Sequence, residues 1–453
     1  MIRMSLSTAA ESLHANFLGQ DVEFAGCSTD SRTLKGGELF IALKGEQFDG
    51  HDFIPAAREA GARAAMVEKT GQADLPLLVV NDTRQAMGSL AGLWRARFRI
   101  PLVAITGSNG KTTVKEMLVS ILRLEAPVLA TRGNLNNNIG VPLTLFGMGH
   151  DHRFAVVEMG ANHPGEIGWL SRMARPTVAL ITQCAPAHLE GFGSVDGVAR
   201  AKSEIYEGLD REGIAIINAD DPYAGFWRQK ITGFHQLSFG LEHPADVHAP
   251  DITLSGTSGA SAFAIHTPIG KIDVSLSLPG RHNVSNALAA AACAIGLRID
   301  PGQIKRGLEH MSPIRGRLEL RPGMNNSRLI DDTYNANPAS LRVALDVLAG
   351  FQGRRWLVLG DMGELGAEAA GLHARAGEMA KASGVERLYA IGPLCAAAVK
   401  SFGTGAHHFT EADSLAARLV SDIEPGVTVL IKGSRAMRME KLAAVLEAKT
   451  PAC

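Results

Sequence analysis

The residues best suited to chemistry stand in one short stretch, Gly107-Ser108-Asn109-Gly110-Lys111-Thr112-Thr113. An apolar, β-prone run precedes it at 101–105, and apolar residues at helical spacing follow it over 114–122. A glycine-rich turn between a strand and a helix surrounds an anion with free backbone N–H groups and the positive end of the helix dipole. Lys111 would then reach the β- and γ-phosphates of a nucleotide, and the Thr112 hydroxyl would hold Mg²⁺. The stretch predicts a nucleotide-binding loop, with an ordinary glycine-rich turn as the alternative.

The loop is shorter than the common phosphate-binding pattern, which has a glycine five residues before the one that precedes the lysine. Ile105 occupies that position, and Gly107 opens the loop three residues before Gly110. We still predict nucleotide binding, because strand, loop, Lys-Thr pair and helix follow one another in the required order. The residues expected to contact the nucleotide here are Thr106, Gly107, Ser108, Asn109, Gly110, Lys111, Thr112 and Thr113.

Two more predicted strands lead to residues that can hold a metal ion. The apolar run 154–157 ends at Glu158, and the run 178–181 is followed by His188. The carboxyl ends of parallel strands face one crevice, so both side chains are expected near the glycine-rich loop. Glu158 is interpreted as a Mg²⁺ ligand. A solvent-facing glutamate and a structural histidine are the alternatives.

Asparagines gather in two places that could meet a ligand. Four of them fall between Gly133 and Gly140, and two more, Asn283 and Asn286, open an alanine-rich helix that runs to Gly296. Amide groups can both donate to and accept from phosphate, base or substrate. The first group could equally be a turn-rich connector, and the second could cap its helix.

The composition is that of an ordinary globular protein. The 453 residues allow roughly three domains, and 46% are hydrophobic and 20% charged. The net charge of −1 provides no basic field for nucleic acid. The five cysteines are scattered without a CxxC pair, which favours reduced thiols. With no signal-peptide pattern and no run of about 18 apolar residues, we predict a cytoplasmic protein without membrane insertion.

The order of the predicted elements divides the chain into three units. Residues 1–98 mix short strands and helices, and residues 99–316 alternate strands and helices in the way of a parallel sheet. Residues 317–453 repeat that alternation without a GxGxxG motif. The expected class is therefore α/β, with a central P-loop ATPase domain on a parallel sheet and a C-terminal Rossmann-like domain. In the first unit, Asp30-Ser31-Arg32 and Lys44 suit a phosphate or nucleotide handle, or form an ordinary polar turn.

Motifs spread over nearly the whole chain resemble those of the ATP-dependent Mur ligase family, in the order that the family has them. The start of the chain and the Tyr334–Pro338 motif are most similar to the branch that joins D-alanyl-D-alanine to UDP-N-acetylmuramoyl-tripeptide, and the Asp-Asn-Pro-Arg motif of the diaminopimelate-adding branch is absent. The motifs are Thr29–Arg32, Thr106–Thr113, Asn138–Gly140, Glu158–Ala161, Ala187–Glu190, Ala201–Lys202, His282–Asn286, Gly316–Glu319 and Asp331–Pro338.

The resemblance implies a peptide ligase that forms an acyl phosphate from a carboxylate and ATP, with a first domain for the UDP-sugar-peptide and a third that closes over the site. It implies two Mg²⁺ ions. The sequence carries no signal of oligomeric state, and a monomer is the default expectation. The resemblance implies that His188 is a ligand of the second ion and that Lys202 is carbamylated. For Lys202, a plain surface lysine is the alternative. The catalytic set is then Lys111, Glu158, His188 and Lys202, and the metal ligands are Thr112, Glu158, His188 and Lys202.

The resemblance also implies roles for residues at the ends of the substrates. Asn138 would contact the γ-phosphate region. Adenine and ribose would be held by Asn283, Asn286, Arg317 and Asp332; the UDP end by Asp30, Ser31, Arg32 and Lys44; and D-alanyl-D-alanine by Asn335 and Asn337.

Two other functions stay open at this point. One is another amide ligase of the superfamily, either a different Mur ligase or a folylpolyglutamate synthase. The other is a regulatory or scaffold protein that binds ATP without turnover, although such a protein has little use for the Glu158, His188 and Lys202 set. The sequence leaves open whether the third residue of the peptide is diaminopimelate or lysine.

Overall fold

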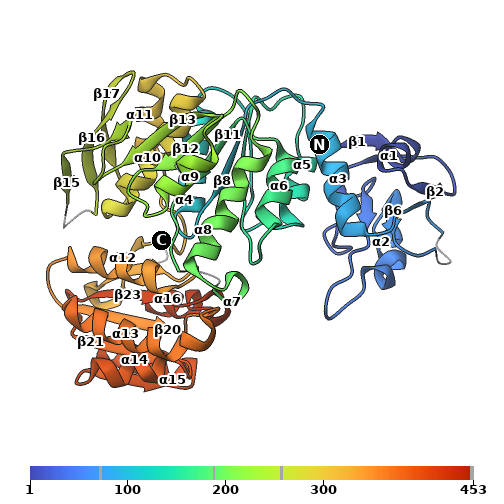
Figure 1. The fold of residues 1–453 in the computed structure, drawn as a ribbon. Helices are drawn as coiled ribbons and strands as arrows, with labels where there is room; N and C mark the ends of the chain where they lie inside the picture. Colours follow the sequence, from blue (N-terminus) through green and yellow to red (C-terminus); the bar gives the residue numbers. More distant parts are fainter. Residues whose placement is uncertain (71–73, 187–188, 256–258, 449–453) are drawn as a thin grey trace, which may run out of the picture.

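The computed structural model describes residues 1–70, 74–186, 189–255 and 259–448, and within them three α/β units follow one another along the chain (Figure 1). The main sheets of these units have five, ten and six strands. The expected class, α/β with a central parallel-rich sheet and a second such sheet at the C-terminal end, is confirmed. The domain boundaries at residues 98 and 316 stay predictions.

The first unit is built on a sheet in the order β2-β7-β6-β5-β4, in which only β2 is antiparallel to its neighbour. A separate antiparallel pair, β1 with β3, lies beside it. The elements are β1 Arg3–Ser5, α1 Leu6–Leu13, β2 Asn16–Leu18, β3 Glu23–Ala25, β4 Cys27–Ser28, β5 Leu39–Ile41, η1 Gly50–Phe53, α2 Ile54–Glu59, β6 Ala64–Val67, β7 Leu77–Val79 and α3 Thr83–Arg95.

The second unit places β8 (Leu102–Thr106) in the middle of its sheet, between β10 and β11 and parallel to both. Successive side chains of a strand point to opposite faces, and both faces of β8 are covered, so the strand is apolar from Leu102 to Ile105. Leu102 and Ala104 belong to the core shared with the first unit, and Val103 and Ile105 to the core under α4 and α10. The parallel neighbours all end at one edge of the sheet.

On one side, β9 pairs with β10 in parallel. On the other side, the parallel strands β12, β13 and β14 follow β11, and β14 pairs with an antiparallel hairpin made of β16 and β17. The elements are α4 Lys111–Arg123, β9 Val128–Ala130, α5 Gly140–Phe146, β10 Phe154–Glu158, α6 Glu166–Ala174, β11 Val178–Ile181, α7 Leu189–Phe192, α8 Val195–Ser203, η2 Glu204–Gly208, β12 Ile214–Asn218, α9 Ala224–Lys230, β13 His235–Gly240, β14 Val247–His248, β15 Ile252–Leu254, β16 Ser261–Thr267, β17 Gly270–Leu276, α10 Arg281–Gly296 and α11 Pro301–Glu309.

The third unit has the sheet order β18-β19-β23-β20-β21-β22, parallel except for the edge strand β18. Figure 1 shows it below the central unit, with α12 on the side that faces that unit. The elements are β18 Glu319–Pro322, η3 Met324–Asn326, β19 Arg328–Asp332, α12 Pro338–Ala349, β20 Arg355–Gly360, η4 Gly366–Glu368, α13 Ala369–Ala382, β21 Arg387–Ile391, α14 Cys395–Phe402, β22 Ala406–Phe409, α15 Ala412–Asp422, β23 Thr428–Lys432, η5 Arg435–Met437 and α16 Glu440–Leu446.

Within the described ranges, none of the helices combines the length and the apolar character needed to cross a lipid bilayer.

The first and second units are joined where α3 packs against α6. Gly88 on α3 faces the ring of Trp169 on α6, and a Cβ at Gly88 would lie 2.1 Å from Trp169 Cζ2. One turn later, a Cβ at Gly92 would find its nearest neighbour, Met173 Cγ, at an ordinary 3.6 Å. Glycine at position 88 is therefore required by the close approach of the two helices.

We expect Gly88→Ala to lower the free energy of unfolding by about 1–3 kcal/mol, because the added methyl group overpacks the Trp169 contact. Gly92→Ala is the matched control on the same helix, and it should be neutral or stabilising by up to about 1 kcal/mol, since alanine is the better helix former. Urea unfolding followed by circular dichroism measures both. Equal gains in stability for the two variants would contradict this account of the helix contact.

Candidate functional site

A cleft of about 970 Å³ opens at the carboxyl ends of β8, β10 and β11. All three units line it: the loop after β8 and the helix α8 from the second, Arg317 and Asp332 near the start of the third, and Glu46 and Arg84 from the first. This is the edge of a parallel sheet at which ligands collect. Two of the predicted groups of the second unit, the glycine-rich loop and Glu158, therefore meet at one place.

The glycine-rich loop is held against the end of β11. The backbone N–H of Ser108 donates to the carbonyl of Gln183 at 2.8 Å, and the Thr182 hydroxyl donates to the carbonyl of Asn109 at 2.6 Å. At Gly107, with φ of 151°, a Cβ would lie 1.8 Å from the Thr182 hydroxyl oxygen, so no side chain fits there. The loop thus delivers the N-terminus of α4, which begins at Lys111, to the cleft.

Lys111 lies at the centre of this loop. Its Nζ donates to the Gly107 carbonyl at 2.6 Å, so the ammonium group lies over the loop in which a phosphate would bind. Loss of surrounding water lowers the pKa of Lys111, the Glu158 carboxylate raises it, and the Arg317 guanidinium lowers it. Positive charge held in a site with little water favours a polyanionic ligand.

Glu158 ends β10, and the residue is only 2% exposed. The Thr112 hydroxyl donates to Oε2 and the Asn136 amide donates to Oε1, both at 2.8 Å. The solvent-facing alternative is therefore wrong for Glu158. A hydroxyl oxygen beside an oriented carboxylate is the hard-oxygen donor set that Mg²⁺ takes, so these residues fit the ion expected from the sequence.

Lys202 is buried on α8 and lines the same cleft, so the surface-lysine alternative is wrong. Burial is the largest cause that lowers its pKa, to about 7, and the Lys111 cation lowers it further, whereas Cys184 and Asp221 raise it. An amine of this kind is largely neutral just above neutral pH. His188, predicted to lie near Lys202, falls outside the described residues.

The third unit reaches the glycine-rich loop through two hydrogen bonds. Arg317 donates to the Thr112 hydroxyl at 2.9 Å, and its guanidinium lies 4.1 Å from the centre of the Tyr334 ring. Asn337 donates from its side-chain amide to the Asn109 side chain at 2.9 Å, and also caps α12 through Ser340. The third unit is therefore docked on the loop rather than separated from it.

Other predicted residues also line the cleft. Asp332 forms a short ion pair with the buried Lys432, whose Nζ also donates to the Asn335 carbonyl at 3.0 Å. Asn138, Asn283 and Asn286 complete this set. Thr106, by contrast, is fully buried at the end of β8, behind the loop.

The predicted handle of the first unit lies outside the cleft lining. Asp30 and Arg32 pair with each other at 2.7 Å, and hydrogen bonds from Arg32 hold the pKa of Asp30 at about 2. Ser31 belongs to the same turn, and the backbones of Lys44 and Asp49 form an isolated β-bridge across a short loop. The two residues that this unit contributes to the lining, Glu46 and Arg84, are ones that we did not single out from the sequence.

Asn136 and Lys432 were also missed. Asn136 belongs to the predicted asparagine group, but nothing in the sequence distinguishes it from Asn138 as the partner of Glu158. Lys432 carried a usable signal, because it follows the predicted strand at 427–431 and so had to lie at the carboxyl edge of a parallel sheet.

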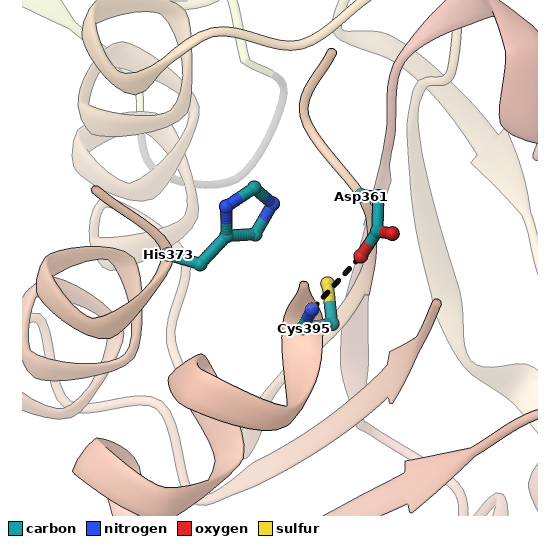
Figure 2. Close-up of side chains that lie close together, drawn as sticks. All are labelled: Asp361, His373 and Cys395. Carbon is teal, nitrogen blue, oxygen red and sulfur yellow. Dashed lines mark hydrogen bonds between the residues drawn. The ribbon is translucent and has the colours of Figure 1, made fainter. Parts of the chain in front are cut away.

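A second cluster of potential metal ligands lies elsewhere in the third unit, at Asp361, His373 and Cys395 (Figure 2). Both ring nitrogens of His373 are already used, Nδ1 with the Ala369 carbonyl at 2.7 Å and Nε2 with the Met362 N–H at 2.9 Å. Asp361 accepts from the Cys395 N–H at 2.8 Å, and burial raises the pKa of the Cys395 thiol. A protonated thiol and a saturated imidazole are poor ligands, so the cluster fastens β20 to α13 and α14.

Comparison with known proteins identifies three successive matches to family models. Residues 23–95 match the Mur ligase family catalytic domain, residues 105–294 the Mur ligase middle domain, and residues 316–435 the Mur ligase glutamate ligase domain. The UDP-N-acetylmuramoyl-tripeptide–D-alanyl-D-alanine ligase of Escherichia coli K12 is 43% identical over 449 residues, which are 99% of each chain. Its counterpart from Bacillus subtilis 168 is 33% identical and covers 98% of each chain.

Solved structures agree with these matches. Crystal structure I of MurF from Acinetobacter baumannii superposes with a TM-score of 0.93 at 37% identity, over 98% of each chain. MurF ligase from Thermotoga maritima in complex with ADP has a TM-score of 0.81 at 27% identity, over 93% of this chain and 96% of that one.

We expect Asn136→Ala to weaken the binding of Mg²⁺-ADP about three- to tenfold, because the Glu158 carboxylate loses the amide that orients it. Binding of ADP without the metal should stay unchanged. Asn134→Ala is the matched control, since Asn134 lines the same cleft from the same loop. Isothermal titration calorimetry with and without Mg²⁺ measures the difference. An equal loss under both conditions would show that Asn136 acts on the loop and not on the metal site.

Proposed function

This chain belongs to the Mur ligase family, and from that membership and its cleft we propose that it joins D-alanyl-D-alanine to a UDP-N-acetylmuramoyl-tripeptide in peptidoglycan precursor synthesis, with ATP converted to ADP and phosphate. The observation that carries the proposal is a phosphate-type loop beside the buried Glu158 and Lys202, in a chain that relatives with this named activity match from end to end.

The reaction has two steps. A carboxylate oxygen of the tripeptide attacks the γ-phosphorus of ATP, the bond to the β-γ bridging oxygen breaks, and ADP leaves behind an acyl phosphate. The dipeptide amine then attacks the acyl carbon, loses a proton, and expels phosphate as the amide forms. The protein mainly positions these groups and stabilises charge. Lys111 and the N–H groups at the start of α4 would hold the phosphates, with Asn138 toward the γ end.

Thr112 and Glu158 would hold one Mg²⁺, and His188 and a carbamylated Lys202 a second. When bound, the ions would neutralise charge on the phosphate oxygens. The support from this chain is the oxygen donor pair at Thr112 and Glu158 and the low pKa of Lys202. A neutral lysine amine adds to CO₂ and releases a proton, which converts Lys202 into an anion suited to a metal ion.

The base and ribose of ATP would lie against Asn283, Asn286, Arg317 and Asp332. Asp30, Ser31, Arg32 and Lys44 stay predictions for the UDP end. Arg32 and Lys44 are exposed and Asp30 and Ser31 half-buried in the first unit, which suits a long substrate that begins there and ends in the cleft. For D-alanyl-D-alanine, Asn335 and Asn337 stay predictions. The engagement of Asn337 with Asn109 and Ser340 makes it a positioning residue for this end of the site.

A relative bears directly on the third residue of the peptide. A UDP-N-acetylmuramoylalanyl-D-glutamyl-2,6-diaminopimelate–D-alanyl-D-alanyl ligase from Acinetobacter baumannii is 37% identical, with a TM-score of 0.88 over 98% of each chain. We propose diaminopimelate as the third residue for this chain too. The monomeric state and the cytoplasmic location stay predictions. Folylpolyglutamate synthase from Mycobacterium tuberculosis shares the fold at 17% identity, which favours no second function.

We expect Lys111→Ala to reduce kcat for ADP release at least about 100-fold, because the γ-phosphoryl group loses its main cation. The exposed Lys400→Ala serves as the control and should be unchanged. ADP release and the new amide bond are followed together by a coupled assay and mass spectrometry, with each acceptor omitted in turn. Retained turnover in Lys111→Ala would overturn the loop assignment, and ADP release that is independent of both peptide substrates would overturn the ligase assignment.

We also expect a carbamate on Lys202 that depends on pH. Its pKa of about 7 leaves the amine mainly neutral at pH 8 and mainly protonated at pH 6, so the adduct should form at pH 8 and fade toward pH 6. Carbon-13 NMR with labelled bicarbonate detects it. Lys202→Ala should abolish the signal and regain part of its activity with short carboxylic acids. Lys230→Ala, on the adjacent helix α9, should keep the signal. Absence of both signal and rescue would favour a cationic role for Lys202.

A further inference from the structure

Glu46 and Arg84 are the side chains that the described part of the first unit contributes to the cleft lining, and the proposed reaction leaves both without a role. They carry opposite charges. Within the described ranges Arg84 has a single hydrogen-bond partner, the Lys44 carbonyl at 3.3 Å through Nη2, so its other guanidinium donors remain available. Among the residues that the structure describes, no hydrogen bond or ion pair engages the Glu46 carboxylate.

Both residues are held in place by the fold. Arg84 is the second residue of α3, whose start is anchored where the Thr83 hydroxyl donates to the Ala42 carbonyl at 3.1 Å. Glu46 lies in a tight loop that is closed by the backbone β-bridge between Lys44 and Asp49. That loop ends at Gly50, where a Cβ would lie 2.6 Å from the Leu43 carbonyl oxygen. The Arg84–Lys44 hydrogen bond then joins the helix to the loop.

The substrate that reaches this side of the cleft can be identified from the reaction. The UDP end belongs to the first unit and the reacting carboxylate to the loop around Lys111, so the amino acid that carries this carboxylate lies between them. Its side chain is the part of the peptide free to meet Glu46 and Arg84. A lysine side chain ends in an amine alone, whereas a diaminopimelate side chain ends in an amine and a carboxylate.

We propose that Glu46 and Arg84 read the side-chain end of the third peptide residue, Glu46 binding its amine and Arg84 its carboxylate. The inference rests on the proposed function. An acid and a guanidinium together match a zwitterionic end, and a guanidinium binds a carboxylate in a planar, two-bonded geometry that an ammonium group cannot reproduce. A lysine end would leave the Arg84 donors unmatched, and an unmatched polar group at a binding site discriminates against the substrate.

The carboxylate of D-alanyl-D-alanine is the competing ligand for Arg84. A cation stands closer to where that dipeptide is expected, because Arg435 of the third unit lines the cleft beside Tyr334, at 5.9 Å from its ring centre. The dipeptide amine must also be unprotonated to attack, so it offers Glu46 a neutral hydrogen-bond donor, whereas the amine at the end of a diaminopimelate side chain offers a cation. The pair of opposite charges therefore fits the third residue better than it fits the acceptor.

The test uses the full chain and three UDP-N-acetylmuramoyl-tripeptides whose third residue is diaminopimelate, lysine, or diaminopimelate amidated at its side-chain carboxylate. Dissociation constants come from calorimetry and KM values from ADP release. Arg84→Met should raise both about tenfold for the diaminopimelate substrate, the loss expected for a two-bonded carboxylate contact, and less than about twofold for the other two. Glu46→Gln should weaken all three about three- to tenfold, because all three carry the amine.

Two further variants separate recognition from support of the loop. Arg84→Lys keeps a charge and a donor for the Lys44 carbonyl and should recover part of the diaminopimelate affinity. Arg58→Met is the matched control, since Arg58 is exposed in the same unit, pairs with Asp74 at 2.6 Å and is not a lining residue of the cleft. It should leave all three substrates unchanged, and KM for ATP should be constant throughout the series.

An equal effect of Arg84→Met on all three substrates would reduce it to a support of the Lys44 loop and overturn the proposal. A rise in KM confined to D-alanyl-D-alanine would overturn it in favour of the acceptor. The proposed function fails separately, if the unaltered protein releases no ADP with any tripeptide and the dipeptide. The calorimetric contrast among the three tripeptides still decides the role of the pair in that case, because binding needs no turnover.

Discussion

The hydrogen bond from the Thr112 hydroxyl to the Glu158 carboxylate is the contact around which the site is arranged. It joins the first turn of α4 to the end of β10 through two residues that are 46 positions apart in the sequence. The contact is possible because β8 and β10 are parallel neighbours and so end at one edge of the sheet. A metal ion chelated by a phosphate needs a hydroxyl and a carboxylate at one place, and the sheet topology provides it.

The electrostatics of the cleft follow from the same packing. Lys111 lies close enough to Lys202 for its cation to lower the pKa of Lys202, and both side chains lie where water is scarce. Two neighbouring cations in such a place are unstable without a negative partner. A polyanionic nucleotide would supply one, and the proposed conversion of Lys202 into a carbamate would remove one of the two positive charges. The site is thus organised for ligands that carry negative charge.

Hydrophobic periodicity and the topology of parallel sheets predict much of the fold and the centre of the site from the sequence. Apolar runs in the sequence predict the strands β6, β10, β11 and β20, and the rule that ligands gather at the carboxyl ends of parallel strands predicts that Lys111, Thr112 and Glu158 lie together, as they do in the cleft. The edge strands β18 and β22 were missed. They are short and only partly buried, so they lack the apolar run that identifies a buried strand.

The other omissions share a different cause. Asn136, Glu46 and Arg84 act through pairings across loops, and polar loop residues show no period that separates a partner of the site from its neighbours. The same limit explains why Asn138 and Asn136 could not be distinguished within one run of asparagines. Lys202 is buried because it lies on the face of α8 that packs on the core. In a helix of only nine residues, the apolar pattern that would identify this face in the sequence is weak.

The groups that would receive a nucleotide already have partners within the protein. Lys111 donates to the Gly107 carbonyl, Arg317 to the Thr112 hydroxyl, and Asn337 to Asn109. Binding of ATP would therefore exchange hydrogen bonds rather than add them, and an exchange contributes little net free energy. The gain must come from charge, because phosphate oxygens would replace neutral partners beside Lys111 and Arg317. Two of these three hydrogen bonds come from the third unit, so the exchange would also change how that unit is held against the loop. Nucleotide binding is thereby linked to the position of the third unit.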